Sequence, residues 1–143
     1  MTETKSPRSL RIPLPLPSEK LFPNKRSNNR FALTKAKRKA RSDSALVTKL
    51  MMEKNGITTP FAAATLRAEF TLRTRRDRDN LNAWLKSYQD GLQDAKLVTN
   101  DACIIPLSPI IFITKETLGQ VGVDLIVTEI ERPDNQQVHD VQE

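Results

Sequence analysis

The chemistry open to this chain is limited first by what it lacks. Its 143 residues include one cysteine and one histidine. A single cysteine excludes an internal disulfide and a cysteine-cluster metal site. His139 stands alone in a polar stretch, which excludes a zinc site of the usual kind and makes histidine general-base chemistry unexpected. Catalysis by this chain would therefore have to rest on carboxylates and a metal ion.

Glycine and long apolar runs are also scarce. With only four glycines in the chain, no glycine-rich phosphate-binding loop is present. No apolar run approaches the roughly 18 residues that a membrane helix needs, so we expect no membrane partner. The N-terminal stretch lacks the apolar core of a secretory signal, which favours a cytoplasmic location.

The length of the chain predicts one domain with one buried core. We expect residues 1–9 to form a disordered leader, residues 10–131 the domain, and residues 132–143 a polar C-terminal tail. The apolar content of 38% and the charged content of 28% fit a globular protein with polar ends.

The net charge of +6 is distributed unevenly along the chain. Residues 1–54 hold 14 Lys/Arg against 4 Asp/Glu, residues 55–100 hold 7 against 5, and residues 101–143 hold 2 against 8. A basic front half is the expected footprint of a nucleic-acid partner, whose phosphates it neutralises. A solubilising surface would explain a basic helix equally well, so both interpretations stay open on charge alone.

Apolar periodicity predicts the order of strands and helices. Residues 10–17 alternate like a strand, and their prolines, which cannot donate to a ladder, favour an edge position or an extended run. Further strands are predicted at the end of 62–73 and at 100–105, 109–114 and 123–130. The inward residues of the first of these are Leu66, Ala68, Phe70 and Leu72.

Two helices are predicted between these strands. The first runs from about residue 28 to residue 54, and its apolar stripe consists of Ala32, Ala36, Ala40, Val47, Leu50 and Met51. The second is capped by Asp79 or Asn80. Its apolar positions are Leu81, Trp84, Leu85, Tyr88 and Leu92. Trp84 and Tyr88 could stack on bases, but their spacing beside three leucines favours the core.

The most informative motif is the run of residues 73–80, Arg-Thr-Arg-Arg-Asp-Arg-Asp-Asn. On an extended segment, Asp77 and Asp79 would lie on the same face, where two carboxylates repel unless a cation lies between them. A third carboxylate, Asp101, opens a later apolar segment. Acidic groups that hold a metal beside basic groups that hold phosphate would fit this run. A solvated turn of mixed charge is the alternative.

The order of these residues resembles the RusA family of Holliday junction resolvases, many of which are carried by phages and prophages. The residues that carry the resemblance are Arg76-Asp77-Arg78-Asp79-Asn80, Lys86, Asp90-Gly91-Leu92 and Asn100-Asp101. The resemblance covers about residues 10–131, and its specific part is the Asp-x-Asp-Asn motif followed by Asp101.

Two positions depart from the family pattern. The family lysine usually stands four residues after the second aspartate, where this chain has Ala83. Lys86 comes three residues later, which corresponds to about 4.5 Å and about 300° of helix. Asn100 stands where the family usually has a second aspartate, and an asparagine carbonyl can bind a metal but contributes no charge.

The resemblance implies an Mg²⁺-dependent endodeoxyribonuclease that resolves four-way DNA junctions in recombination and repair. Asp77, Asp79 and Asp101 would hold the Mg²⁺, which prefers carboxylate oxygens. Lys86 would place a positive charge near the scissile phosphate. Products would carry 5′-phosphates and 3′-hydroxyls, and symmetric cutting implies a homodimer with twofold symmetry.

Basic residues along the chain are expected to contact the phosphates of branched DNA. These residues are Arg75, Arg76, Arg78, Lys25, Arg26, Lys35, Lys37, Arg38 and Lys39. The expected fold is α+β, with a small mixed β-sheet packed by helices in a single domain. The alternative function is that of a non-catalytic, basic nucleic-acid-binding protein with a degenerate acidic site.

Overall fold

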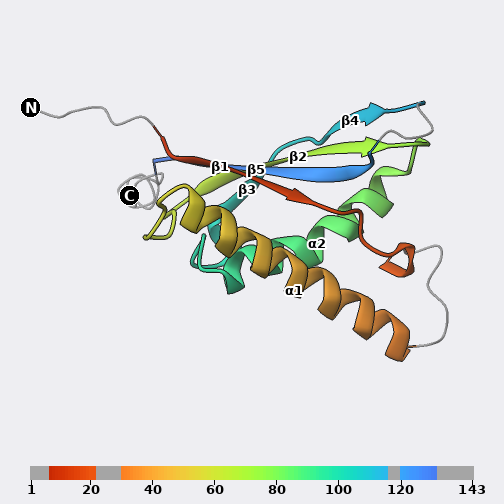
Figure 1. Cartoon of the computed structure of the whole chain (residues 1–143), viewed down its shortest axis with the longest axis horizontal. Helices are drawn as coiled ribbons and strands as arrows, with labels where there is room; N and C mark the ends of the chain where they lie inside the picture. Colours follow the sequence, from red (N-terminus) through yellow and green to blue (C-terminus); the bar gives the residue numbers. More distant parts are fainter. Residues whose placement is uncertain (1–6, 22–29, 116–119, 132–143) are drawn as a thin grey trace, which may run out of the picture.

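Two helices cover one face of a five-stranded mixed sheet, and the other face of the sheet carries no helix of the described chain (Figure 1). The computed structural model describes residues 7–21, 30–115 and 120–131, without the side chains of Lys20 and Asp101. This arrangement confirms the predicted α+β fold with a small mixed sheet.

The sheet combines antiparallel and parallel pairing. Its strands are β1 (Ser9–Leu14), β2 (Ala64–Leu72), β3 (Ile104–Pro106), β4 (Ile110–Ile113) and β5 (Gly122–Glu129). β5 pairs antiparallel with both β1 and β2. β3 and β4 pair parallel with the first and last parts of β2, respectively. β1 is therefore one edge of the sheet, as its prolines predict, and β3 with β4 forms the other.

Alternating apolar residues of the three long strands form the core beneath the sheet. The register aligns them in three rows, Leu10–Val127–Leu66, Ile12–Leu125–Ala68 and Leu14–Val123–Phe70. All nine side chains are buried. Because side chains alternate across a strand, the polar residues between them face away from the helices. The predicted inward residues of β2 are confirmed.

Helices α1 (Arg30–Lys54) and α2 (Arg78–Asp94) cross closely beneath the sheet. The Ser44 hydroxyl donates to the backbone oxygen of Tyr88 at 2.7 Å, and Arg41 contacts Asp94 through two hydrogen bonds of 2.6 and 2.8 Å. Gly91 lies at the crossing, where it leaves room for Ser44.

The predicted apolar stripe of α1 is wrong at Leu50, whereas Val47 and Met51 are half-buried and pack against the core. Leu50 is 54% exposed, whereas Ser44 and Thr48 are fully buried. The small polar side chains allow the close approach of α2, and Ser44 recovers a hydrogen bond there. Apolar periodicity alone could not identify these two positions, because neither residue type is apolar.

We expect Gly91→Ala to lower the free energy of unfolding by about 2 kcal/mol. A methyl group at position 91 would lie 2.5 Å from Ser44 Cβ and 2.6 Å from the Arg41 backbone oxygen, so the helices would have to separate. Urea unfolding followed by circular dichroism measures the change. Gln93→Ala, at an exposed position of the same helix, is the control, and a loss at Gly91 no larger than at Gln93 would contradict the close crossing.

The two aromatic residues of α2 fix the segment that follows β1. Trp84 Nε1 donates to the Ser18 backbone oxygen at 3.0 Å, and the Tyr88 hydroxyl donates to the Pro15 backbone oxygen. Both rings are buried, and burial raises the pKa of Tyr88 above its usual value. The core interpretation of these rings is confirmed. The segment they hold continues into the short helix η1 (Glu19–Leu21).

Several predicted boundaries shift in the structure. β1 begins one residue early, at Ser9, and the preceding Arg8 contacts Glu129 at 2.9 Å. The predicted strand at 100–105 starts instead with the short helix η3 (Asp101–Cys103) before β3. The C-terminal tail at 132–143 lies outside the described residues.

Candidate functional site

The acidic pair lies where β2 turns into α2. Asp77 is the N-cap residue of α2, with φ −65° and ψ 146°, and Asp79 belongs to the first helical turn. The predicted cap at Asp79 or Asn80 is therefore wrong by two or three residues, and only Asp77 keeps the extended backbone assumed for the pair. The reason is local: the backbone oxygen of Asp77 accepts from the N–H groups of Asn80 and Leu81, at 3.0 and 3.1 Å, so the helix begins at Arg78.

The carboxylates of the pair remain accessible. Asp77 makes no side-chain capping hydrogen bond, although it occupies the cap position. Both Asp77 and Asp79 are exposed. The next residue, Asn80, is buried, and its Oδ1 has no hydrogen-bond partner among the described residues. The backbone thus presents two carboxylates whose oxygens are open to a ligand.

A cavity of about 670 Å³ lies between α1 and α2 and joins the acidic and basic residues. The residues that line it are Leu21, Thr34, Lys37, Arg38, Arg41, Asp79, Asn82, Ala83, Lys86, Ser87 and Asp90. Asp79 and Lys86 come from α2, and Lys37 and Arg38 come from α1. Four predicted site residues from two separate motifs therefore share one cavity.

Lys86 lies on the same face of α2 as Asp79. Seven residues separate them, which is almost two whole turns and about 10.5 Å along the helix axis. Ala83, where the family pattern has lysine, lines the cavity as well. The three-residue displacement therefore moves the lysine along the cavity but does not remove it from the cavity.

Sequence reasoning missed other members of the cavity. Thr34 and Arg41 on α1 and Asn82 on α2 had no predicted role, and Asp90 was named only among the residues that carry the family resemblance. The spacing of residues 79, 82, 83, 86 and 90 follows one helical face and could have identified the α2 members. Among them, Arg41 lowers the pKa of Asp94 through their hydrogen bonds.

The other predicted basic residues divide into three groups. Arg75, Arg78 and Lys35 are exposed. Arg76 contacts Glu19 of η1 at 2.6 Å, and Lys39 contacts Asp43 at 3.1 Å, so both have acidic partners. Lys25 and Arg26 lie outside the described residues.

The turn that carries Asp101 is far from the acidic pair within one chain. Ile104, just after this turn, is in register with Ala64 at the start of β2, whereas Asp77 and Asp79 follow its end. Nine residues of strand span about 26 Å. No group of three or more acidic, cysteine or histidine side chains in the described chain could hold a metal ion. Within the described residues, the turn that carries Asp101 and the acidic pair therefore lie at opposite ends of β2.

Two accessible carboxylates nevertheless suit Mg²⁺. This cation usually keeps several waters and binds through one or two protein carboxylates together with substrate phosphates. Asp77 and Asp79 supply that donor set, and Lys37, Arg38 and Lys86 supply cations for the phosphates. The residues present thus fit the metal as part of a complex with a phosphate-bearing substrate.

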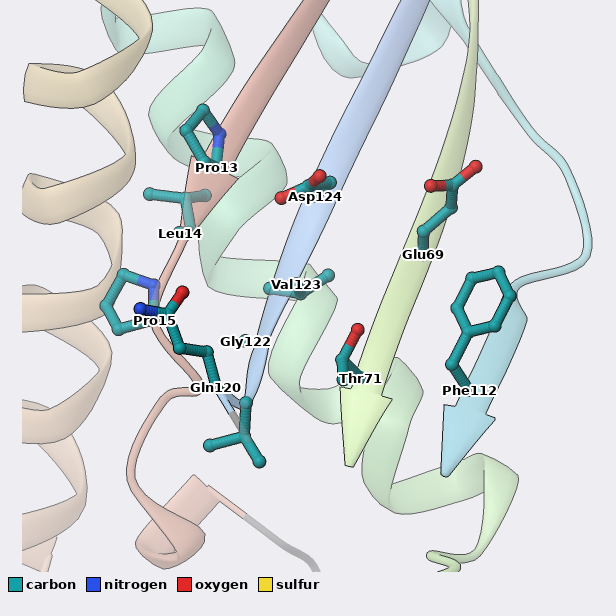
Figure 2. A pocket seen from close by; sticks show the side chains of 11 residues that line it. Pro13, Leu14, Pro15, Glu69, Thr71, Phe112, Gln120, Gly122, Val123 and Asp124 are labelled. Carbon is teal, nitrogen blue, oxygen red and sulfur yellow. The ribbon is translucent and has the colours of Figure 1, made fainter. Parts of the chain in front are cut away.

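A second cavity, of about 350 Å³, lies on the uncovered face of the sheet (Figure 2). Glu69 and Asp124 line it from adjacent positions on β2 and β5. Arg11 bridges them, with Nη1 3.2 Å from Glu69 Oε1 and 2.6 Å from Asp124 Oδ2. Because the arginine already balances both carboxylates, this acidic pair is a weaker candidate for a metal than Asp77 and Asp79.

No protein-family model matches this chain, and no curated protein matches it. Among the described helices, none is both long and apolar enough to cross a membrane.

Proposed function

We propose that the protein is an Mg²⁺-dependent endodeoxyribonuclease that cuts branched DNA, with the four-way junction as its substrate. The observation that carries this proposal is the cavity that Asp79 and Lys86 share with Lys37 and Arg38. A carboxylate for the metal and cations for phosphate are the two requirements of phosphodiester hydrolysis, and here they come from separate helices. The resemblance of residues 76–101 to the RusA family supports the junction as substrate.

The proposed reaction is hydrolysis of one phosphodiester bond. A water oxygen adds to phosphorus, the bond to the 3′ oxygen breaks, and the departing oxygen takes a proton, which leaves a 5′-phosphate and a 3′-hydroxyl. Asp77 and Asp79 would hold the Mg²⁺, which would supply Lewis-acid stabilisation of charge on the phosphoryl oxygens. Lys86 adds a positive charge within the same cavity, and α1 holds the flanking phosphates.

Symmetric cutting of a junction requires two like active sites. A homodimer with twofold symmetry supplies them, because each copy then meets one of two equivalent strands. We therefore include a homodimer in the proposal.

Cleavage of a synthetic four-way junction tests the proposal. Purified protein is incubated with a junction whose arms are labelled in turn, with Mg²⁺ or with a chelator, and products are resolved on denaturing gels. We expect paired, Mg²⁺-dependent nicks that DNA ligase can reseal. Binding of the junction without any cleavage, in Mg²⁺ and in Mn²⁺, would reject the nuclease.

One arrangement favours the rival function, a non-catalytic DNA-binding protein. Acidic residues at the start of a helix are stabilising without any ligand, because they interact with the helix dipole. Asp77 and Asp79 occupy such positions, and the turn of Asp101 is remote. The cleavage assay separates the two functions, since the rival predicts binding alone.

Binding should weaken steeply with salt and depend on α1. Each phosphate contact contributes roughly −0.9 to the slope of log K against log salt. Replacing Lys37, Arg38 and Lys39 with alanine should flatten that slope by up to about 2.7 if all three contact phosphate. Fluorescence anisotropy with a labelled junction, over a series of salt concentrations, measures the slope.

A matched variant controls for net charge. Replacing Lys49, Lys54 and Lys96, which are exposed on α1 and after α2, removes the same three charges outside the cavity. If both triple variants flatten the slope equally, DNA does not bind at the proposed surface.

A further inference from the structure

The edge formed by β4 exposes an unusual amount of apolar surface. All four of its residues are apolar and exposed, from 36% for Ile110 to 52% for Phe112. Ile105 and Leu107, which precede it along the same edge, are 43% and 38% exposed. Ile110 and Phe112 project to the uncovered face of the sheet, and Ile111 and Ile113 project to the helical face. Together these exposed side chains leave on the order of 400 Å² of apolar surface along one edge.

The backbone of this edge is also open to pairing. Thr114 N–H donates to Leu72 O on β2 at 2.8 Å. Because backbone groups point to alternate sides along a strand, those of Ile111 and Ile113 point away from β2. No strand within the described residues pairs with β4 on that side. Exposed, uncharged edges of this kind pair readily with another strand.

We propose that a second copy of this chain pairs with β4, antiparallel and edge to edge, so that two sheets become one. The patch is complementary to itself, because apolar residues of one copy meet apolar residues of the other. The chain's own tail is a poor occupant, since residues 132–143 are mostly polar and charged.

The outward backbone groups of β4 favour a register centred on Phe112 over one centred on Ile111. In a twofold antiparallel pair, the residue on the axis lies opposite its own counterpart. With Phe112 on the axis, Ile111 lies opposite Ile113 of the second copy, and all outward N–H and C=O groups of both residues are used. With Ile111 on the axis, Ile113 would face a proline, Pro109, which has no N–H to donate. The register centred on Phe112 therefore forms more hydrogen bonds within β4 than the register centred on Ile111, and it is the register that the next experiment tests.

This pairing would set the relative positions of the two active sites of a dimeric nuclease, a consequence that rests on the proposed function. A twofold axis perpendicular to the sheet leaves α1 and α2 of both copies on one face. The order β2–β4–β4–β2 places the two β2 strands about 14 Å apart. Both acidic pairs, which follow β2, would then serve a junction lying against the helical face.

Disulfide trapping tests the register. Phe112→Cys is made in a Cys103→Ser background, so that each copy has one thiol. Phe112 projects beside β2 on the uncovered face of the sheet (Figure 2), and a residue on the axis lies close to its counterpart. We expect a disulfide-linked dimer after mild oxidation. Ser9→Cys in the same background, exposed on the opposite edge strand, is the control and should form no disulfide-linked dimer.

Sedimentation measures the assembly without any trap. Wild-type protein should sediment as a dimer at tens of micromolar, and Phe112→Glu, which places two like charges opposite each other, should be monomeric with an unchanged circular dichroism spectrum. A wild-type monomer, equal trapping at Ser9, or a dimer unaffected by Phe112→Glu would overturn the inference. A dimer that cuts no junction would leave the inference standing and reject the nuclease, whereas an active monomer would do the reverse.

Discussion

Replacing Asp79 with asparagine should abolish junction cleavage while junction binding stays intact or becomes slightly tighter. The change removes one unit of negative charge from the proposed metal site but keeps the shape of the side chain. Metal stabilisation of the transition state is worth several kcal/mol, so the cleavage rate should fall by about 1,000-fold or more. Binding should not suffer, because the lost carboxylate repels the DNA backbone. Asp77→Asn should behave in the same way.

Single-turnover cleavage and gel-shift assays without metal measure the two effects separately. Asp124→Asn is the control, since it makes the same chemical change on the uncovered face of the sheet, where Arg11 already balances the carboxylate. It should cut normally. Parallel loss of cleavage and binding in Asp79→Asn would mean that the carboxylate supports the fold or the DNA surface, not the metal.

Lys86→Ala should slow cleavage on the order of 100-fold at saturating enzyme, with a much smaller loss of affinity. A preorganised positive charge near the phosphoryl oxygens commonly contributes a few kcal/mol to transition-state stabilisation. The structure also suggests a second substitution that should restore the rate. Ala83 lines the same cavity, about 4.5 Å closer to Asp79 along the helix. The double variant Lys86→Ala/Ala83→Lys should therefore regain most of the lost rate.

The rescue variant distinguishes the effect of a positive charge inside the cavity from the effect of the protein's overall charge. Lys96→Ala, beyond the C-terminal end of α2, removes an equal charge outside the cavity and should leave the rate unchanged. If Lys86→Ala cuts normally while Arg76→Ala is inactive, another cation fills the proposed role of Lys86. The assignment of metal to Asp77 and Asp79 does not depend on that outcome.

The fold was predictable where periodicity was strong. β2 and β5 alternate regularly, and the apolar residues of α2 recur at helical spacing, so element type followed from sequence. The error in the stripe of α1 occurs where a tertiary contact decides the outcome. Ser44 and Thr48 are buried because α2 crosses there, and no local pattern marks two small polar residues as core.

The candidate site was predictable in part. Residues close in sequence, such as Asp79 and Lys86, share a helix, so their proximity follows from spacing. The contribution of Lys37 and Arg38 required the packing of α1 against α2. The position of Asp101 could not be predicted, because the order of motifs along the chain does not give the distances between them in the fold. Helix α2 runs back along β2, so the turn that follows α2 lies at the far end of β2 from the acidic pair.

The fluorescence of the buried indole of Trp84 can be used to follow the folding of the protein. It is the one tryptophan of the chain, 2% exposed, with its ring centroid 6.3 Å from that of Phe70. Its fluorescence therefore arises from one place, where α2, the sheet and the segment ending at Ser18 meet. Emission should shift to longer wavelength when water reaches the ring. DNA bound in the cavity between the helices should leave the emission wavelength unchanged. The fluorescence of Trp84 can therefore distinguish loosening of the core from binding of DNA at the site.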